Sequence, residues 1–216
     1  TVADDSFEGG TLVRIVVVGG AGTIGTAVVE LLSARHDVVV AGRRSGDVRV
    51  DISSRDSVQS MYRRIGSLDA LACAAGEAHF GPFETMTDEE LELGVQSKLL
   101  GQLRLVLLGR SLISEAGSFT LISGYIFDDP IPEATSFAVA NGGIEGFVRA
   151  AALRLERRVR IGEVLNGAVS RPSEAASSGA RVSGRSAIRP STVPIENFDW
   201  WTVCGSTTGP RTSMAP

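Results

Sequence analysis

VVVGGAGTIG, residues 16–25, is the stretch that decides the fold of this chain. Its apolar start is typical of a strand buried on both faces, and AVVELLSAR, which follows directly after Thr26, has the spacing of a helix. The glycine turn between them lets the backbone approach a pyrophosphate, and the helix N-terminus adds free N–H groups and a positive dipole end. A tight turn that binds nothing has the same glycines. The expected cofactor contacts here are Gly19, Gly22, Thr23, Ile24 and Gly25.

The residues after the second apolar run indicate which dinucleotide is bound. A site that prefers NAD places an Asp or Glu at the end of this strand, on the ribose hydroxyls. Residues 36–42 form the run here, and it is followed by Arg43 and Arg44, with no carboxylate before Asp47. Guanidinium groups grip phosphate oxygens with paired, charge-assisted bonds, which suits a 2′-phosphate. The pattern favours NADP(H), although a solvated basic turn would have the same sequence.

Strand and helix patterns alternate along most of the chain. Further strands are expected at residues 48–52, 68–74, 118–123 and 160–165, and further helices at 53–65, 87–113 and 135–155. Short links between alternating strands and helices predict a parallel sheet with helices on both faces. We therefore expect residues 1–216 to form one α/β domain, a single Rossmann-type doubly wound sheet. Residues 1–11 are expected to be a flexible segment, and residues 171–202, rich in Ser, Pro, Gly and Arg, an irregular loop or lid.

Composition excludes several functions and suggests a setting. The net charge of −4 and the lack of a long basic run argue against nucleic-acid binding. Cys73 and Cys204 are too few for a disulfide framework or a zinc site, so no metal is expected. No apolar run reaches the roughly 18 residues of a membrane span. We expect a cytoplasmic protein with a small-molecule substrate. It is expected to be a homodimer or homotetramer, because the 135–155 helix is apolar around its whole circumference.

Together the motifs resemble those of the short-chain dehydrogenase/reductase family, in particular a compact bacterial branch of it. VVVGGAGTIG is similar to the family's cofactor loop, VDIS to its adenine-side strand end, CAAG to its Asn-Asn-Ala-Gly turn and TLISG to its serine-bearing strand. NGGIEGFVRAAALRL, VRIGEVLNGAVS and VCGSTTG resemble the sixth helix, the strand after it and the last strand. The resemblance covers residues 12 to about 170 and implies a nicotinamide cofactor. The cofactor contacts that it adds are Asp51, Ile52, Ala74, Ala75, Gly76 and Asn141.

The catalytic end departs from the family pattern. Alignment on the sixth helix places Phe137 where the family has its general-acid Tyr. It places Asn141 where the family has the Lys that lowers the pKa of this Tyr and holds the nicotinamide ribose. Phe cannot deliver a proton, and Asn carries no charge to lower a phenol pKa. The resemblance therefore implies an intact adenine end and an altered nicotinamide end.

Three other side chains are candidates for the missing chemistry. Ser123 holds the family's serine position and could orient a substrate carbonyl. Tyr125 lies two residues further and points to the same side if the chain stays extended, so it could donate a proton. Lys98, the only lysine, lies where the family often has an active-site Asn and could lower the pKa of Tyr125. The simpler interpretations are a strand-end serine, a pocket wall and a surface lysine.

These residues leave three functions open. The first is an NADPH-dependent oxidoreductase that acts on a small carbonyl or hydroxyl compound. The second is a non-redox enzyme on the same scaffold, an isomerase, dehydratase or cyclase. The third is an NADP-binding regulatory or scaffold protein. A fold does not decide among them, because function depends on the site that the fold carries.

Overall fold

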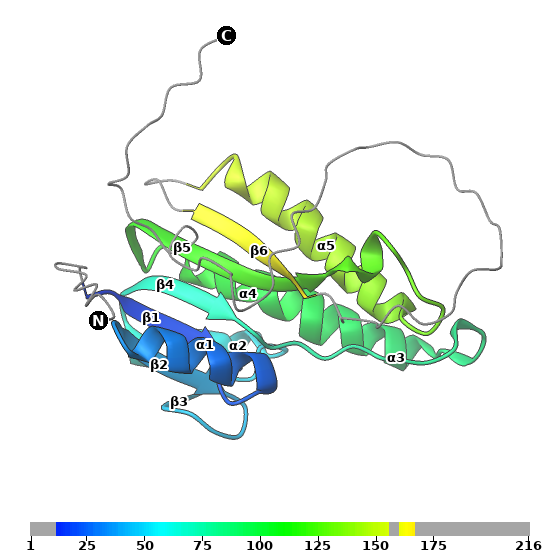
Figure 1. The fold of residues 1–216 in the computed structure, drawn as a ribbon, viewed down its shortest axis with the longest axis horizontal. Helices are drawn as coiled ribbons and strands as arrows, with labels where there is room; N and C mark the ends of the chain where they lie inside the picture. The colour runs from blue at the N-terminus through cyan, green and yellow to red at the C-terminus, as the bar shows by residue number, and fades with distance from the viewer. Residues whose placement is uncertain (1–11, 156–159, 167–216) are drawn as a thin grey trace, which may run out of the picture.

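The computed structural model describes residues 12–155 and 160–166, so the expectations for residues 1–11, 171–202 and VCGSTTG lie outside the described part. Its centre is a six-stranded parallel sheet of order β3-β2-β1-β4-β5-β6 (Figure 1). The strands are β1 Arg14–Val18, β2 Asp37–Gly42, β3 Val48–Arg49, β4 Leu68–Cys73, β5 Ile113–Gly124 and β6 Arg160–Asn166.

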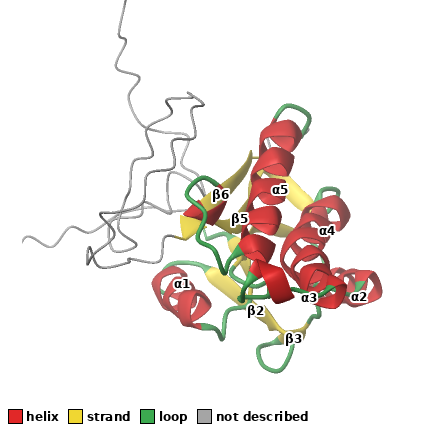
Figure 2. Cartoon of the chain, turned by 90° about the vertical axis from the view of Figure 1, so that its right-hand side faces the viewer, coloured by secondary structure: helices red, strands yellow, loops and turns green. Residues whose placement is uncertain are grey.

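Helices cover both faces of this sheet. They are α1 Thr23–Ser33, α2 Arg55–Ile65, α3 Asp88–Leu93, α4 Leu100–Gly109 and α5 Thr135–Ala152. A π-helical turn, η2 Gly94–Leu99, joins α3 to α4, and short 3₁₀ turns lie at η1 Phe83–Thr85 and η3 Tyr125–Phe127. Figure 2 shows α1 on one side of the sheet and α2, α4 and α5 on the other. The predicted doubly wound Rossmann-type fold is therefore confirmed.

Strand β1 shows how the sequence divides the core. Ile15 and Val17 pack with α1, whereas Val16 and Val18 belong to the larger core under α2, α4 and α5. This alternation follows from the pleat, which directs successive side chains to opposite faces. All four are at most 1% exposed, as the apolar run predicts for a strand covered on both sides.

Several predicted boundaries were wrong. The helix expected at 87–113 begins with the predicted capping box of Thr87 and Glu90, but it contains the η2 turn and ends at Gly109. The Leu-rich sequence hides this end, because the buried Ile113 already pairs with β4 as the first residue of β5. The edge strand β3 is shorter than residues 48–52, since only its first two residues pair with β2.

Gln102 of α4 supports the end of β5, a role that no sequence pattern indicated. Its side chain is fully buried, its Nε2 donates to the carbonyl oxygen of Ile122 at 2.9 Å, and its Oε1 accepts from the Ile122 N–H at 2.8 Å. The pairing of β4 with β5 ends at Ala72 and Thr120. The Gln102 amide therefore takes the place of the next residue of β4.

Replacing Gln102 with Leu should lower the free energy of unfolding by roughly 2–6 kcal/mol. Leu keeps the volume but leaves the N–H and C=O of Ile122 unpaired, and each buried unpaired group costs about 1–3 kcal/mol. Chemical denaturation measures the change. Gln59→Leu on α2 is the control, because the side chain of Gln59 makes no hydrogen bond with the described residues. Equal losses in the two variants would contradict the role of Gln102.

Candidate cofactor and active site

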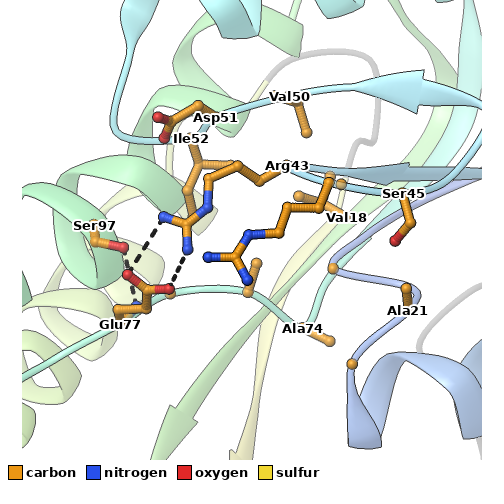
Figure 3. Close-up of a pocket in the computed structure, with 16 residues that line it drawn as sticks. Val18, Ala21, Arg43, Ser45, Val50, Asp51, Ile52, Ala74, Glu77 and Ser97 are labelled. Atoms are coloured by element: carbon orange, nitrogen blue, oxygen red, sulfur yellow. Dashed lines mark hydrogen bonds and ion pairs between the residues drawn. The ribbon is translucent and has the colours of Figure 1, made fainter.

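A cleft of about 360 Å³ opens beyond the carboxyl ends of β1, β2 and β4 (Figure 3). Ligands of open parallel sheets bind at this edge. The predicted contacts that line the cleft are Gly19, Gly22, Arg43, Arg44, Asp51, Ile52, Ala74, Ala75 and Gly76. Lining residues that were not among the predicted contacts are Val18, Ala21, Gly42, Ser45, Val50, Glu77 and Ser97. The predicted contacts Thr23, Ile24, Gly25 and Asn141 are not among its lining residues.

Glycine is required at two positions of the loop after β1. Gly19 has a φ of +81°, and a Cβ there would lie 2.8 Å from the carbonyl oxygen of Ala74. Gly25 lies in the first turn of α1, where a Cβ would lie 2.7 Å from the Cα of Gly20. Real Cβ atoms do not approach backbone this closely, so larger residues would displace the loop. Gly25 thus does not line the cleft, but it allows α1 to pack closely against the loop that does.

The N-terminus of α1 faces this loop without a partner of its own. Gly22 is the N-cap, no side chain caps the helix, and no acidic residue lies in its first turn. The first N–H groups of a helix and its dipole attract anions. Together with the close backbone approach at Gly19, this end of the cleft fits the pyrophosphate of a dinucleotide.

The two arginines after β2 differ in their ion-pair and hydrogen-bond partners. Arg43 forms a two-point ion pair with Glu77, which raises the pKa of Arg43 through the hydrogen bond and the opposite charge. Arg44 makes no ion pair or hydrogen bond with any described residue. Asp47, the first carboxylate after β2, instead accepts the backbone N–H of Val40 at 2.9 Å. No carboxylate therefore stands at the end of β2 to bind ribose hydroxyls.

Outside the lining of the cleft, helix α5 contacts β5 through Ser123 and η2 through Lys98. Ser123, at the end of β5, is 2% exposed and its hydroxyl donates to the backbone carbonyl of Asn141 on α5 at 3.3 Å. Lys98 of η2 is 7% exposed, and its Nζ lies 5.9 Å from the ring centroid of Phe137. Lys98 is therefore no surface lysine.

Two buried polar groups of these residues lack a hydrogen bond to the described part of the chain. The Asn141 Oδ1 is buried and has no hydrogen-bond partner. The Lys98 ammonium has neither a hydrogen-bond acceptor nor a carboxylate among the described residues, and burial lowers its pKa. A buried polar group without a partner is costly, so such groups are rare unless a ligand or another part of the protein completes them.

The two described tyrosines differ in whether their hydroxyl groups have a hydrogen-bond partner. Tyr125 is half-buried and begins the η3 turn directly after the extended Gly124, and its hydroxyl has no hydrogen bond among the described residues. Tyr62 is buried on α2, and its hydroxyl donates to the Leu105 carbonyl at 2.6 Å. Tyr62 therefore has a structural role, whereas the hydroxyl of Tyr125 donates to no described residue. The ring that contacts Lys98 belongs to Phe137, and no contact between Lys98 and Tyr125 accompanies it.

In residues 12–155 and 160–166, no group of three or more His, Cys, Asp or Glu side chains is placed to hold a metal ion. None of the helices in the same ranges is both long and apolar enough to cross a membrane.

The sheet order and the cleft define a dinucleotide-binding α/β protein of the Rossmann type. Residues 8–191 match the family model described as enoyl-(acyl carrier protein) reductase. The chain belongs to the short-chain dehydrogenase/reductase family, whose members are NAD(P)(H)-binding oxidoreductases. A search of the curated proteins gives no match.

Solved structures agree with this assignment. The protein lin1944 from Listeria innocua is 42% identical with a TM-score of 0.71, over 72% of this chain and 78% of that one. A small-chain dehydrogenase in complex with NADPH is 27% identical with a TM-score of 0.67, over 72% and 70% of the two chains. A short-chain dehydrogenase/reductase variant from Serratia marcescens, 21% identical with a TM-score of 0.64 over 70% and 77%, supports the fold alone.

Proposed function

We propose that the protein is an NADPH-dependent oxidoreductase that acts on a small carbonyl or hydroxyl compound and uses an atypical proton donor. The observation that carries the proposal is the charge around the cleft. Arg43 and Arg44 follow β2, and the first carboxylate after them, Asp47, is turned back onto the backbone of Val40. This arrangement suits a 2′-phosphate better than a bare ribose diol. The NADPH complex of the 27% identical dehydrogenase is consistent with it.

The chain's residues divide into those that hold the cofactor and those that handle the proton. The glycine loop and the α1 N-terminus would hold the pyrophosphate, Arg44 would hold the 2′-phosphate, and Asp51 and Ile52 would lie on the adenine side. When bound, the cofactor supplies or accepts the hydride. Asn141 offers its unpartnered Oδ1 to a hydroxyl group of the ligand.

Proton transfer requires a group other than Phe137, the residue at the position of the family's Tyr. Ser123, at the end of β5, is assigned to orient the substrate oxygen, for which its hydroxyl must turn away from the Asn141 carbonyl to which it now donates. Tyr125 donates the proton, and Lys98 favours the phenolate that results. The support for these roles is that the hydroxyl of Tyr125 has no hydrogen bond in the described part of the chain, and that the ammonium of Lys98 meets only the ring of Phe137 there, with no hydrogen bond and no carboxylate.

A second copy of the chain is the proposed partner. Val139 on α5 and Leu107 on α4 are 46% and 47% exposed, so the described residues leave apolar side chains of both helices uncovered. A homodimer or homotetramer would bury these side chains. Light scattering tests this assembly directly.

A panel of small carbonyl compounds tests the function. Loss of the reduced-nicotinamide absorbance with one of them would support the oxidoreductase. Turnover without a change in the redox state of the cofactor would indicate an isomerase, dehydratase or cyclase instead. A change of assembly on adding NADPH, with no chemistry, would indicate a regulatory protein.

Arg44→Ala should weaken NADPH binding about tenfold to a hundredfold and change NADH binding little. A charged hydrogen bond of this kind contributes roughly 1.5–3 kcal/mol, and only NADPH carries the phosphate. Replacing Arg43 as well should remove most of the preference for NADPH. Titration calorimetry of both nucleotides checks this, with Arg63→Ala on α2 as the control. Equal affinities of the parent protein for the two nucleotides would refute the assignment.

A further inference from the structure

An ion pair crosses the cofactor cleft (Figure 3). Arg43 follows β2 and Glu77 follows β4, on the two sides of the switch in strand order. Their atoms lie 2.6 Å apart for Nη2 and Oε1 and 3.4 Å apart for Nη1 and Oε2. Both Nη atoms of Arg43 are thus occupied by one carboxylate, in the space where adenosine and its phosphate would bind.

Glu77 is fixed in this position by the backbone around it. Its N–H donates to the Oγ of Ser97 at 3.0 Å, and Ser97 is 6% exposed in the η2 turn. The preceding Gly76 has a φ of +136°, and a Cβ there would lie 2.8 Å from the Cα of Lys98. The loop after β4 therefore has little freedom to carry the carboxylate away from the cleft.

Another anion can readily replace Glu77 as the partner of Arg43. The two side chains are 50% and 53% exposed, and solvent-exposed ion pairs are weak. A phosphate carries more negative charge than a carboxylate and binds a guanidinium with the same two-point geometry. A 2′-phosphate can therefore displace Glu77 from Arg43. The displaced carboxylate then remains beside the phosphate and repels it.

We propose that Glu77 sets how strongly the cleft selects NADPH over NADH, because it competes with the 2′-phosphate for Arg43. The inference rests on the proposed NADPH function. Glu77 lowers the affinity for NADPH by holding Arg43 and by adding a like charge, and it has little effect on NADH, which lacks the phosphate. Arg44, which has no competing partner among the described residues, then does most of the selection.

The variant Glu77→Gln tests this with a nearly isosteric change. Titration calorimetry should show NADPH binding about threefold to tenfold tighter than in the parent, with NADH changed by less than about twofold. The gain should shrink in high salt, which screens exposed charges. Glu84→Gln in η1 removes an equal charge outside the cleft and should leave both affinities unchanged.

A double-mutant cycle separates competition from a general charge effect. Arg43→Ala should cost about threefold or less in NADPH affinity in the parent, where Glu77 occupies the guanidinium. It should cost about tenfold in the E77Q protein, where Arg43 is free to bind phosphate. Equal costs in the two backgrounds would overturn the competition.

The remaining outcomes are also decisive. If E77Q leaves the NADPH to NADH ratio unchanged, or weakens NADPH binding, Glu77 does not restrain selection and the inference is wrong. If the parent protein binds no NADPH at all, the proposed function is overturned, and this inference with it. These two failures are distinguishable, because the parent titration alone decides the second.

Discussion

Tyr125→Phe is expected to lower the turnover number about hundredfold and to leave the Kd for NADPH within about twofold. The loss of a general acid removes an interaction made in the transition state, and general acid–base catalysis typically contributes 10²–10⁴-fold. Tyr125 begins the turn that follows β5, two residues after the buried Ser123, and its hydroxyl has no partner in the described part. Steady-state kinetics and titration calorimetry measure the two quantities separately.

The other tyrosine of the chain is a matched control. Tyr62→Phe removes a hydroxyl that donates to the Leu105 carbonyl, so it should lower stability by about 1–3 kcal/mol and leave turnover per folded molecule unchanged. Full activity of the Tyr125→Phe variant would refute the role of Tyr125 and leave it as a wall of the pocket.

Lys98→Met is expected to lower turnover by a similar factor, about hundredfold, and at the same time to stabilise the fold. Met has similar length and no charge, so it removes a buried ammonium that has no carboxylate among the described residues. Replacing buried charges with well-packed apolar side chains is often neutral or stabilising by about 1–4 kcal/mol. A variant that loses activity because it is damaged would lose stability too, so the opposite signs identify a functional lysine.

The pH dependence of stability gives a second signature of Lys98. Burial lowers the pKa of Lys98 in the folded protein, so between the folded and unfolded values the unfolded chain binds more protons. Stability should therefore rise with pH in that window, and Lys98→Met should abolish the rise. Burial raises the pKa of Cys73 to about 11 and also raises that of Tyr62, so these groups lower stability once the pH passes their ordinary values. Both remain in the variant, but Lys98 interacts with Cys73 and lowers its pKa, so the difference between the two proteins reports Lys98 together with its effect on Cys73.

The pH–rate profile tests whether Lys98 acts on the proton donor. The proposed role of Lys98 is to stabilise the deprotonated donor, so its loss should shift the basic limb of the profile upward. Identical basic limbs in the parent and in Lys98→Met would show that Lys98 does not act through Tyr125.

The parts of the fold that follow from local rules were predictable. The apolar run of β1, the glycine turn and the Thr87–Glu90 capping box act between neighbours in the chain, and each is present. The end of α4 was not predictable, because nothing local distinguishes its Leu-rich sequence from the start of β5. There the decision depends on pairing with β4, more than 40 residues away in the chain, as in the pair Leu68 and Ile113.

The candidate site likewise contains residues that could be predicted from the sequence and residues that could not. The glycine loop and the arginines after β2 carry recognisable patterns, so their places around the cleft could be expected. Glu77 carries none, because its significance is a contact with Arg43 that spans 34 residues. The burial of Lys98 was equally hidden, since a single lysine has no pattern and its surroundings come from α5 and β4.

The amide of Gln102 has a consequence for how this site is supported. Beyond Thr120, β5 continues without β4 at its side, and Ser123 and Gly124 pair only with β6. The end of β5 that carries Ser123 is therefore held by Gln102 of α4 on one side and by β6 on the other. Substitutions in α4 can therefore shift the end of β5 without altering residues that line the cleft. The region around Ser123 can thus change in evolution independently of the nucleotide cleft.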